Sequence, residues 1–192
     1  MNLESLEYIL LDPLRALKRN IKTTTFSIIT ASIIFLVFQL FLLYTEIINK
    51  NSKTIFANDP TTITVLKLLG VAALIILLPI LLILVASSFK MAVFSRKDEI
   101  HIMRLIGATD KFIKRPFIVE GIIIGGISAI LGSLSLYILY SVTSIKLAEV
   151  ASELAIVPPS FIITGLLLKS LMVGVIISPL INIASLKKYT NY

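Results

Sequence analysis

The sequence contains no cysteine and only one histidine, His101. Without cysteine the chain can form no disulfide, no thiolate nucleophile and no metal site with cysteine ligands. Segments outside the cytoplasm must therefore be ordered by packing alone. A single imidazole also leaves little basis for a metal site.

Sequence motifs of the common enzyme classes are lacking as well. No Gly-rich loop ends in Gly-Lys-Ser or Gly-Lys-Thr, so the chain is not expected to be an ATPase. There is no His/Glu metal motif, no nucleophile elbow and no pair of carboxylates inside an apolar run. We expect a protein that is not an enzyme and has no cofactor of its own.

Charged residues are scarce, at 15% of the 192 residues, whereas hydrophobic residues make up 57% and the mean hydropathy is +0.98. Soluble domains average about 45–50% apolar residues. The apolar excess is clustered, which indicates that the bilayer is the solvent. The net charge of +7 would suggest nucleic acid in a soluble protein, but here the basic residues lie between the apolar runs. That placement is typical of membrane topology, and no nucleic-acid partner is expected.

Four apolar stretches are long enough to cross a bilayer as helices, which requires about 20 residues each. They cover residues 26–44, 65–88, 117–140 and 161–183. The predicted fold is therefore an all-α integral membrane protein, with a leader over residues 1–25 and a four-span membrane domain over residues 26–192.

The distribution of Lys and Arg predicts the orientation of these spans. Thirteen basic residues lie in the leader, the connection between the second and third spans, and the tail, against three in the other two connections. By the positive-inside rule both termini are expected in the cytoplasm.

Two further helices are expected at membrane surfaces. Apolar residues recur at helical spacing in the leader, from Leu3 to Ile21, which predicts an amphipathic helix in the cytoplasmic interface. That helix could anchor the chain or dock a partner. A short outer helix is predicted around Leu147–Leu154, ended by Pro158-Pro159.

The connection at residues 89–116 has the start and stop residues of two short helices joined at an elbow. The first helix is expected to continue from the second span to Ile106, where Gly107 would stop it. Thr109 is suited to cap a second helix over residues 110–115, and Pro116 to open the third span. Charge alone is compatible with an ordinary basic loop. The helix start and stop residues suggest instead a rigid helical protrusion that a soluble motor protein could push.

The order of residues in this connection resembles the FtsX family of cell-division permeases. The resemblance rests on Arg96, Asp98-Glu99-Ile100, Ile102-Met103-Arg104-Leu105-Ile106-Gly107-Ala108-Thr109, Phe112-Ile113-Lys114-Arg115-Pro116-Phe117 and Glu120-Gly121. It implies a set of residues that couple to an ATPase: Arg96, Glu99, Ile100, Met103, Arg104, Leu105, Ile106, Gly107, Ala108, Thr109 and Phe112.

The resemblance also implies partners. A homodimer is expected, with each copy bound by a cytosolic FtsE-like ATPase that alone binds ATP. The complex would regulate cell-wall hydrolysis from the cytoplasmic membrane, at the division septum. Family members usually carry a folded extracellular domain between the first two spans, where this sequence has only residues 45–64. The chain is thus expected to be a compact member, and contact with a cell-wall hydrolase or its activator would need other segments.

The third span carries the remaining candidate residues, Pro116, Phe117, Glu120, Gly121, Gly125 and Gly132. Small residues at four-residue intervals allow close helix packing, either within one chain or between two copies. Glu120 is expected either to form a structural ion pair or to transmit motion through a basic residue of the leader or elbow.

Two other classes remain open at this point. One is an exporter permease of the lipoprotein or macrolide pump class, and the other is a membrane scaffold that is not coupled to ATP.

Overall fold

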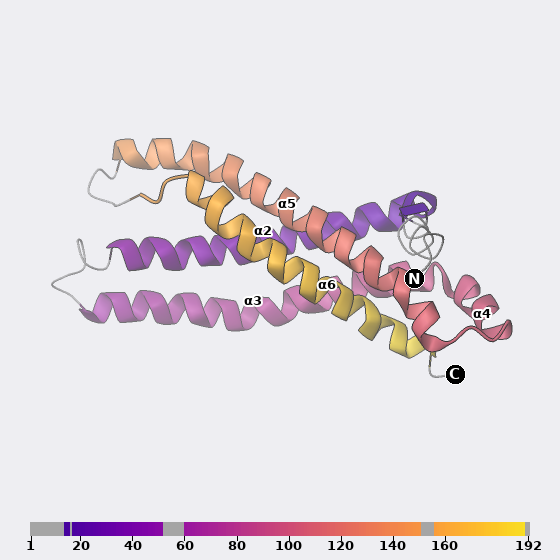
Figure 1. Ribbon diagram of the computed structural model, residues 1–192. Helices are drawn as coiled ribbons and strands as arrows, with labels where there is room; N and C mark the ends of the chain where they lie inside the picture. The colour runs from indigo at the N-terminus through magenta and orange to yellow at the C-terminus, as the bar shows by residue number, and fades with distance from the viewer. Residues whose placement is uncertain (1–13, 16, 52–59, 151–155, 191–192) are drawn as a thin grey trace.

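The computed structural model describes residues 14–15, 17–51, 60–150 and 156–190, and within them every regular element is helical (Figure 1). The elements are α2 (Ile21–Asn51), α3 (Pro60–Phe94), α4 (Lys97–Leu105), α5 (Asp110–Val150), the π-helix η1 (Ile162–Leu166) and α6 (Leu167–Thr190). Helices α2, α3 and α5, and η1 together with α6, are each long and apolar enough to cross a membrane. The predicted all-α fold with four spans is confirmed.

The four long helices share one end of the bundle with α4, which we call the α4 end (Figure 1). Leu17, which precedes α2, packs there against Val85, Phe89 and Ile124. Leu186, near the end of α6, packs against the start of α5 and against α4. The first and last described segments therefore lie at the same end, as an even number of crossings requires. The assignment of this end to the cytoplasm stays a prediction.

Several hydroxyl side chains in the apolar spans are satisfied by their own helices. The Thr30 hydroxyl donates to the Phe26 carbonyl at 2.8 Å, and the Ser32 hydroxyl donates to the Ile28 carbonyl at 2.7 Å. Because each hydroxyl is satisfied within one turn, these residues do not interrupt the span.

The helices are buried to very different extents. In the most apolar window of each span, 39% of the residues are buried in α5 and 33% in η1–α6, but only 11% in α3. Helices α5, α6 and α2 therefore form the packed centre, and α3 lies at the periphery.

Parts of the two predicted surface helices lie outside the described residues. Residues 1–13 and 16 of the leader and residues 151–154 of the outer helix lie outside the described residues. Leu147 belongs to the last turns of α5, so the described part of the outer helix continues the third span.

Candidate functional site

The α4 elbow ends in a hydrogen-bonded stop that only glycine adopts easily. Gly107 has φ +82°, and its N–H donates to the Arg104 carbonyl at 2.9 Å, while the Ala108 N–H donates to the Met103 carbonyl at 3.0 Å. This pair of bonds is a Schellman motif, which satisfies carbonyls at the helix end. The predicted stop at Gly107 is thus observed, and it gives the elbow a defined shape.

The other two helix boundaries predicted for the elbow are wrong. Helix α3 does not run on to Ile106: it ends at Phe94, and a turn at Ser95–Arg96 precedes α4. The physical reason is tertiary, because Arg96 leaves helical geometry (φ −117°, ψ 16°) with its side chain buried between two carboxylates.

There is also no separate helix over residues 110–115. After Thr109, α5 runs unbroken through Pro116 into the span, and the Thr109 carbonyl accepts from Phe112 and Ile113. Pro116 is the seventh residue of α5, so it lacks the one backbone hydrogen bond that its nitrogen would give to the Phe112 carbonyl, and the helix continues past it.

The inward face of α4 is an apolar anchor. Ile100 is buried together with Val93, Ile113, Phe117 and Leu186, and the partly buried Met103 and Ala108 pack against the same cluster. Four elements therefore meet at this point: α3, α4, α5 and α6. Ile100, Met103 and Ala108, three of the predicted coupling residues, hold the elbow to the bundle.

The outward side of the elbow exposes large apolar side chains. The exposed fractions are 59% for Ile102, 74% for Leu105, 78% for Ile106 and 43% for Phe112. We call these four residues the apolar tip. Ile102 was not among the predicted coupling residues, although its spacing to Leu105 and Ile106 (three and four residues) places all three on one helix face.

The remaining predicted coupling residues occupy the flanks of the elbow. Arg104 is half-buried in the last turn of α4, and Thr109 is exposed just before α5. Glu99 lies in the first turn of α4, where a carboxylate is favoured by the positive end of the helix dipole.

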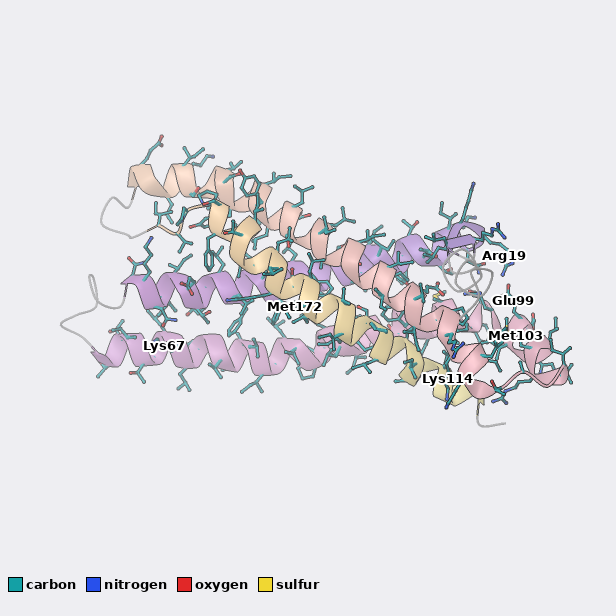
Figure 2. The ribbon with its side chains drawn as sticks, in the orientation of Figure 1. Arg19, Lys67, Glu99, Met103, Lys114 and Met172 are labelled. Carbon is teal, nitrogen blue, oxygen red and sulfur yellow. The ribbon has the colours of Figure 1, made fainter. Side chains whose placement is uncertain are left out.

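Glu99 belongs to a chain of four charged residues that joins three parts of the molecule. Arg96 donates from Nη1 to Glu120 Oε2 at 3.0 Å and from Nε to Glu99 Oε2 at 3.1 Å. Arg19 pairs with the other oxygen of Glu99. Figure 2 shows Arg19, Glu99 and Met103 gathered at the α4 end.

The Arg96–Glu120 pair is the buried part of this chain. Both side chains are 8% exposed, and the Arg96 guanidinium lies 4.9 Å from the centroid of the Phe117 ring. Glu120 was expected to pair with a basic residue, and the structure shows that this residue is Arg96 of the elbow. Because the turn before α4 and the first part of α5 share this pair, movement of the elbow must either move α5 or break the pair.

Three glycines of the third span, Gly121, Gly125 and Gly132, pack within the chain. A Cβ on Gly121 would lie 2.7 Å from the Pro179 Cα, one on Gly125 would clash with the Gly174 carbonyl oxygen, and one on Gly132 would lie 2.9 Å from the Phe35 Cβ. The first two positions face α6 and the third faces α2. Pro116 is half-buried at the entry of the helix.

The partner stripe on α6 was missed by sequence reasoning. Ser170, Gly174, Ser178 and Asn182 recur every four residues, and all four are buried. Asn182 donates from Nδ2 to the Phe117 carbonyl at 2.7 Å, which ties α6 to the start of the third span. The four-residue interval was the signal that could have identified this face.

A polar contact in the middle of the bundle was also missed. Gln39 of α2 is fully buried and donates from Nε2 to the Ser133 hydroxyl of α5 at 2.7 Å. The Ser170 hydroxyl of α6 lies 3.4 Å from the same oxygen. A lone glutamine in an apolar run is a signal of this kind, because a buried amide must find a partner on another helix.

Comparison with known proteins gives a consistent match. The family model described as FtsX-like permease C-terminal matches residues 71–190. The cell division protein FtsX of Streptococcus pneumoniae serotype 2 (strain D39 / NCTC 7466) is 32% identical over 123 residues, which are 63% of this chain and 39% of that protein. The chain thus spans about two fifths of the length of this relative.

Other species contribute shorter matches. The cell division protein FtsX of Bacillus subtilis (strain 168) is 40% identical over 57 residues, 30% of this chain and 19% of that protein. The protein of the same name from Aeromonas hydrophila is 40% identical over 63 residues, 31% of this chain and 19% of that protein.

Proposed function

The chain belongs to the FtsX-like permease family, and from that premise we propose that it is the membrane subunit of a cell-division ABC complex. Its partner would be a cytosolic FtsE-like ATPase, which binds and hydrolyses ATP. The permease itself carries no cofactor and converts the partner's motion into movement of its own helices.

The observation that carries this proposal is the apolar tip. Ile102, Leu105, Ile106 and Phe112 lie on an elbow that connects two membrane spans, at the end of the bundle that carries most of the basic residues. If that end is cytoplasmic, the tip faces water. Exposed apolar side chains gathered in one place mark interaction surfaces. A groove on the ATPase would bury them.

The contacts behind the tip supply the transmission. The inward face of α4 is anchored in the apolar cluster, and Arg96 connects the turn before α4 to Glu120 of α5. Force on the tip would therefore reach the third span through an ion pair and packed side chains. Arg19 connects the residues before α2 to Glu99, so the first span would move with the elbow.

In the full complex two permease copies would pair with two ATPases in the cytoplasmic membrane at the septum. ATP-driven closure of the ATPases would change what the far ends of the spans present outside. An extracytoplasmic cell-wall hydrolase, or its activator, would respond to that change.

The proposal is tested by co-purification in a mild detergent with the FtsE-like ATPase of the same organism. A Leu105→Asp/Ile106→Asp variant should lose the ATPase. Full burial of each side chain contributes about 1.5–3 kcal/mol, so affinity should fall by at least about tenfold per residue. Met103 is a poor probe of docking, because it packs inward and its substitution would disturb the elbow.

His101→Asp is the matched control. His101 lies on α4 and is exposed, but it is not part of the tip, so the new charge should leave the ATPase bound. Equal retention of the ATPase by wild type and by the tip variant would contradict the proposed docking surface. A wild-type preparation that never retains an ATPase would favour the membrane scaffold instead.

A further inference from the structure

A long slot runs between α2 and α3, with α6 as its floor. Its volume is about 580 Å³. The lining includes Phe38 and Phe41 from α2, Ala73 and Leu77 from α3, and Ile177 from α6. The slot exists because α3 lies at the periphery, packed against its neighbours more loosely than α5 is.

The slot is long and follows the axes of the helices. Its lining on α3 extends from Leu69 to Val85. Sixteen helical rises of about 1.5 Å give a length of roughly 24 Å, most of the hydrocarbon thickness of a bilayer. An extended hydrocarbon chain that lies parallel to the helices can therefore occupy it.

The lining is chemically uniform. Apart from Tyr44 and Ser178, all the side chains that line the slot are apolar, or absent in the case of Gly70. The Tyr44 hydroxyl donates to the Leu66 carbonyl at 2.9 Å, so this residue presents its ring to the slot. The ring lies against Gly70, where a Cβ would come within 2.5 Å of Tyr44 Cε1. Such a surface has nothing to offer a polar ligand.

A cation lies at one mouth of the slot. Lys67 is exposed on α3, three residues before Gly70 and seven before Leu74, so it shares the helix face that lines the slot. Figure 2 shows Lys67 away from the α4 end, toward the opposite end of the bundle. A lysine at the end of an apolar span reaches the headgroup layer, where its ammonium attracts phosphate.

We propose that the slot binds one acyl chain of a phospholipid whose phosphate pairs with Lys67. The long apolar lining suits a hydrocarbon chain, and the charge at the mouth favours a lipid with an anionic phosphate. The inference does not depend on any ATPase partner.

The test is a phosphorus assay on the chain after it is purified and washed in mild detergent. Wild type should retain a single phospholipid per chain. Ala73→Trp places a large ring in the slot and should lower the retained lipid at least tenfold, and Lys67→Glu should lower it several-fold. Ile76→Trp is the matched control, because Ile76 is 65% exposed, does not line the slot and should leave the lipid in place.

Three outcomes would overturn the proposal. Equal lipid in all four proteins would mean that only the general lipid shell is measured. Loss of lipid in Ala73→Trp but not in Lys67→Glu would contradict the proposed contact between Lys67 and the lipid phosphate. Because the chain has no cysteine, a Leu77→Cys variant that forms disulfide-linked dimers in membranes would show that a second copy occupies the slot.

A folding defect in Ala73→Trp would not leave the question open. The chain has no tryptophan, so Phe41→Trp, which exchanges one aromatic ring of the lining for another, and Ile76→Trp each give a protein with a single tryptophan. After the detergent wash, phospholipid brominated on its acyl chains should quench the tryptophan of Phe41→Trp and leave that of Ile76→Trp largely unquenched. Equal quenching at the two positions would contradict a specific site.

Discussion

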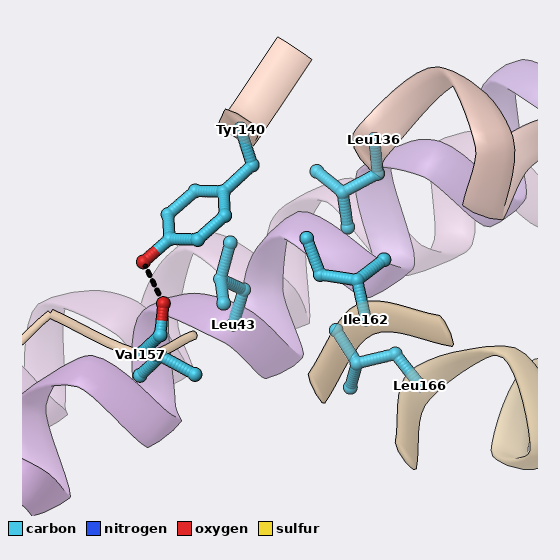
Figure 3. Packing of buried hydrophobic residues seen from close by; sticks show 6 residues of the cluster. All are labelled: Leu43, Leu136, Tyr140, Val157, Ile162 and Leu166. Carbon is cyan, nitrogen blue, oxygen red and sulfur yellow. Dashed lines mark hydrogen bonds between the residues drawn. The ribbon is translucent and has the colours of Figure 1, made fainter. Parts of the chain in front are cut away.

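The two ends of the bundle are held together by different forces. At the α4 end, α3, α4, α5 and α6 meet in one apolar cluster, and a chain of four charges from Arg19 to Glu120 lies beside it. At the opposite end Leu43, Leu136, Tyr140, Val157, Ile162 and Leu166 join α2, α5 and η1 (Figure 3). That cluster is apolar apart from the Tyr140 hydroxyl, which donates to the Val157 carbonyl at 2.9 Å.

The difference shows where the structure can transmit force and where it can open. Charged pairs with defined geometry make the α4 end a connected unit. At the opposite end, none of the described residues in the apolar cluster belongs to α3, and Tyr44 of α2 contacts α3 at Leu66 and Gly70. The slot begins at this place.

The largest effect should come from breaking the buried pair at the α4 end. Arg96→Met leaves Glu120 buried without its partner, which typically costs about 3–5 kcal/mol in free energy of unfolding. The measurement is unfolding by denaturing detergent in mixed micelles. Arg115→Met, at an exposed position on the same side, should change little.

A double variant sharpens this prediction. Arg96→Met/Glu120→Met removes both buried charges and should recover much of the lost stability, because apolar replacement of a buried pair is often close to neutral. If the double variant were no more stable than Arg96→Met, the pair would not be what holds the elbow to α5.

A smaller or comparable loss of stability is expected when a side chain of the apolar cluster at the opposite end is truncated. Leu136 is fully buried, so Leu136→Ala should cost about 2–5 kcal/mol through lost burial and a cavity. The same unfolding assay measures it, with Leu139→Ala as control, since Leu139 is 53% exposed. ATPase binding should survive in Leu136→Ala; its loss would show that the two ends are not separable.

The smallest effect on stability should come from breaking the exposed Arg19–Glu99 ion pair at the α4 end. The side chains of Arg19 and Glu99 are 62% and 36% exposed, so Arg19→Ala should cost less than about 1 kcal/mol. This loss should shrink further when salt is raised, because salt screens exposed pairs, whereas the Arg96→Met loss should not. A cost for Arg19→Ala that did not change with salt would contradict the assignment of this pair to the surface.

Local chemistry accounts for the parts of the site that sequence reasoning predicted. Gly107 was identifiable because a helix stop with positive φ favours glycine, whatever surrounds it. Gly121 and Gly125, four residues apart in the third span, likewise indicate a close contact. Neither pattern says which helix lies opposite, so only the tertiary structure pairs the third span with the stripe on α6 and Gln39 with Ser133.

The amino-acid sequence by itself determined that this chain forms four apolar helices, that its basic residues gather on one side, and that an elbow ends at Gly107. These properties follow from hydropathy, charge and backbone freedom, which act over one or two helical turns. Only the tertiary structure decided that α3 breaks at Ser95–Arg96, that Met103 faces inward while Ile102 faces outward, and that a slot separates α2 from α3. Each of these depends on residues far apart in the chain. The break occurs where Arg96 pairs with Glu120, and the inward face of α4 is set by the cluster around Phe117. The slot depends on α6, which lines it together with α2 and α3.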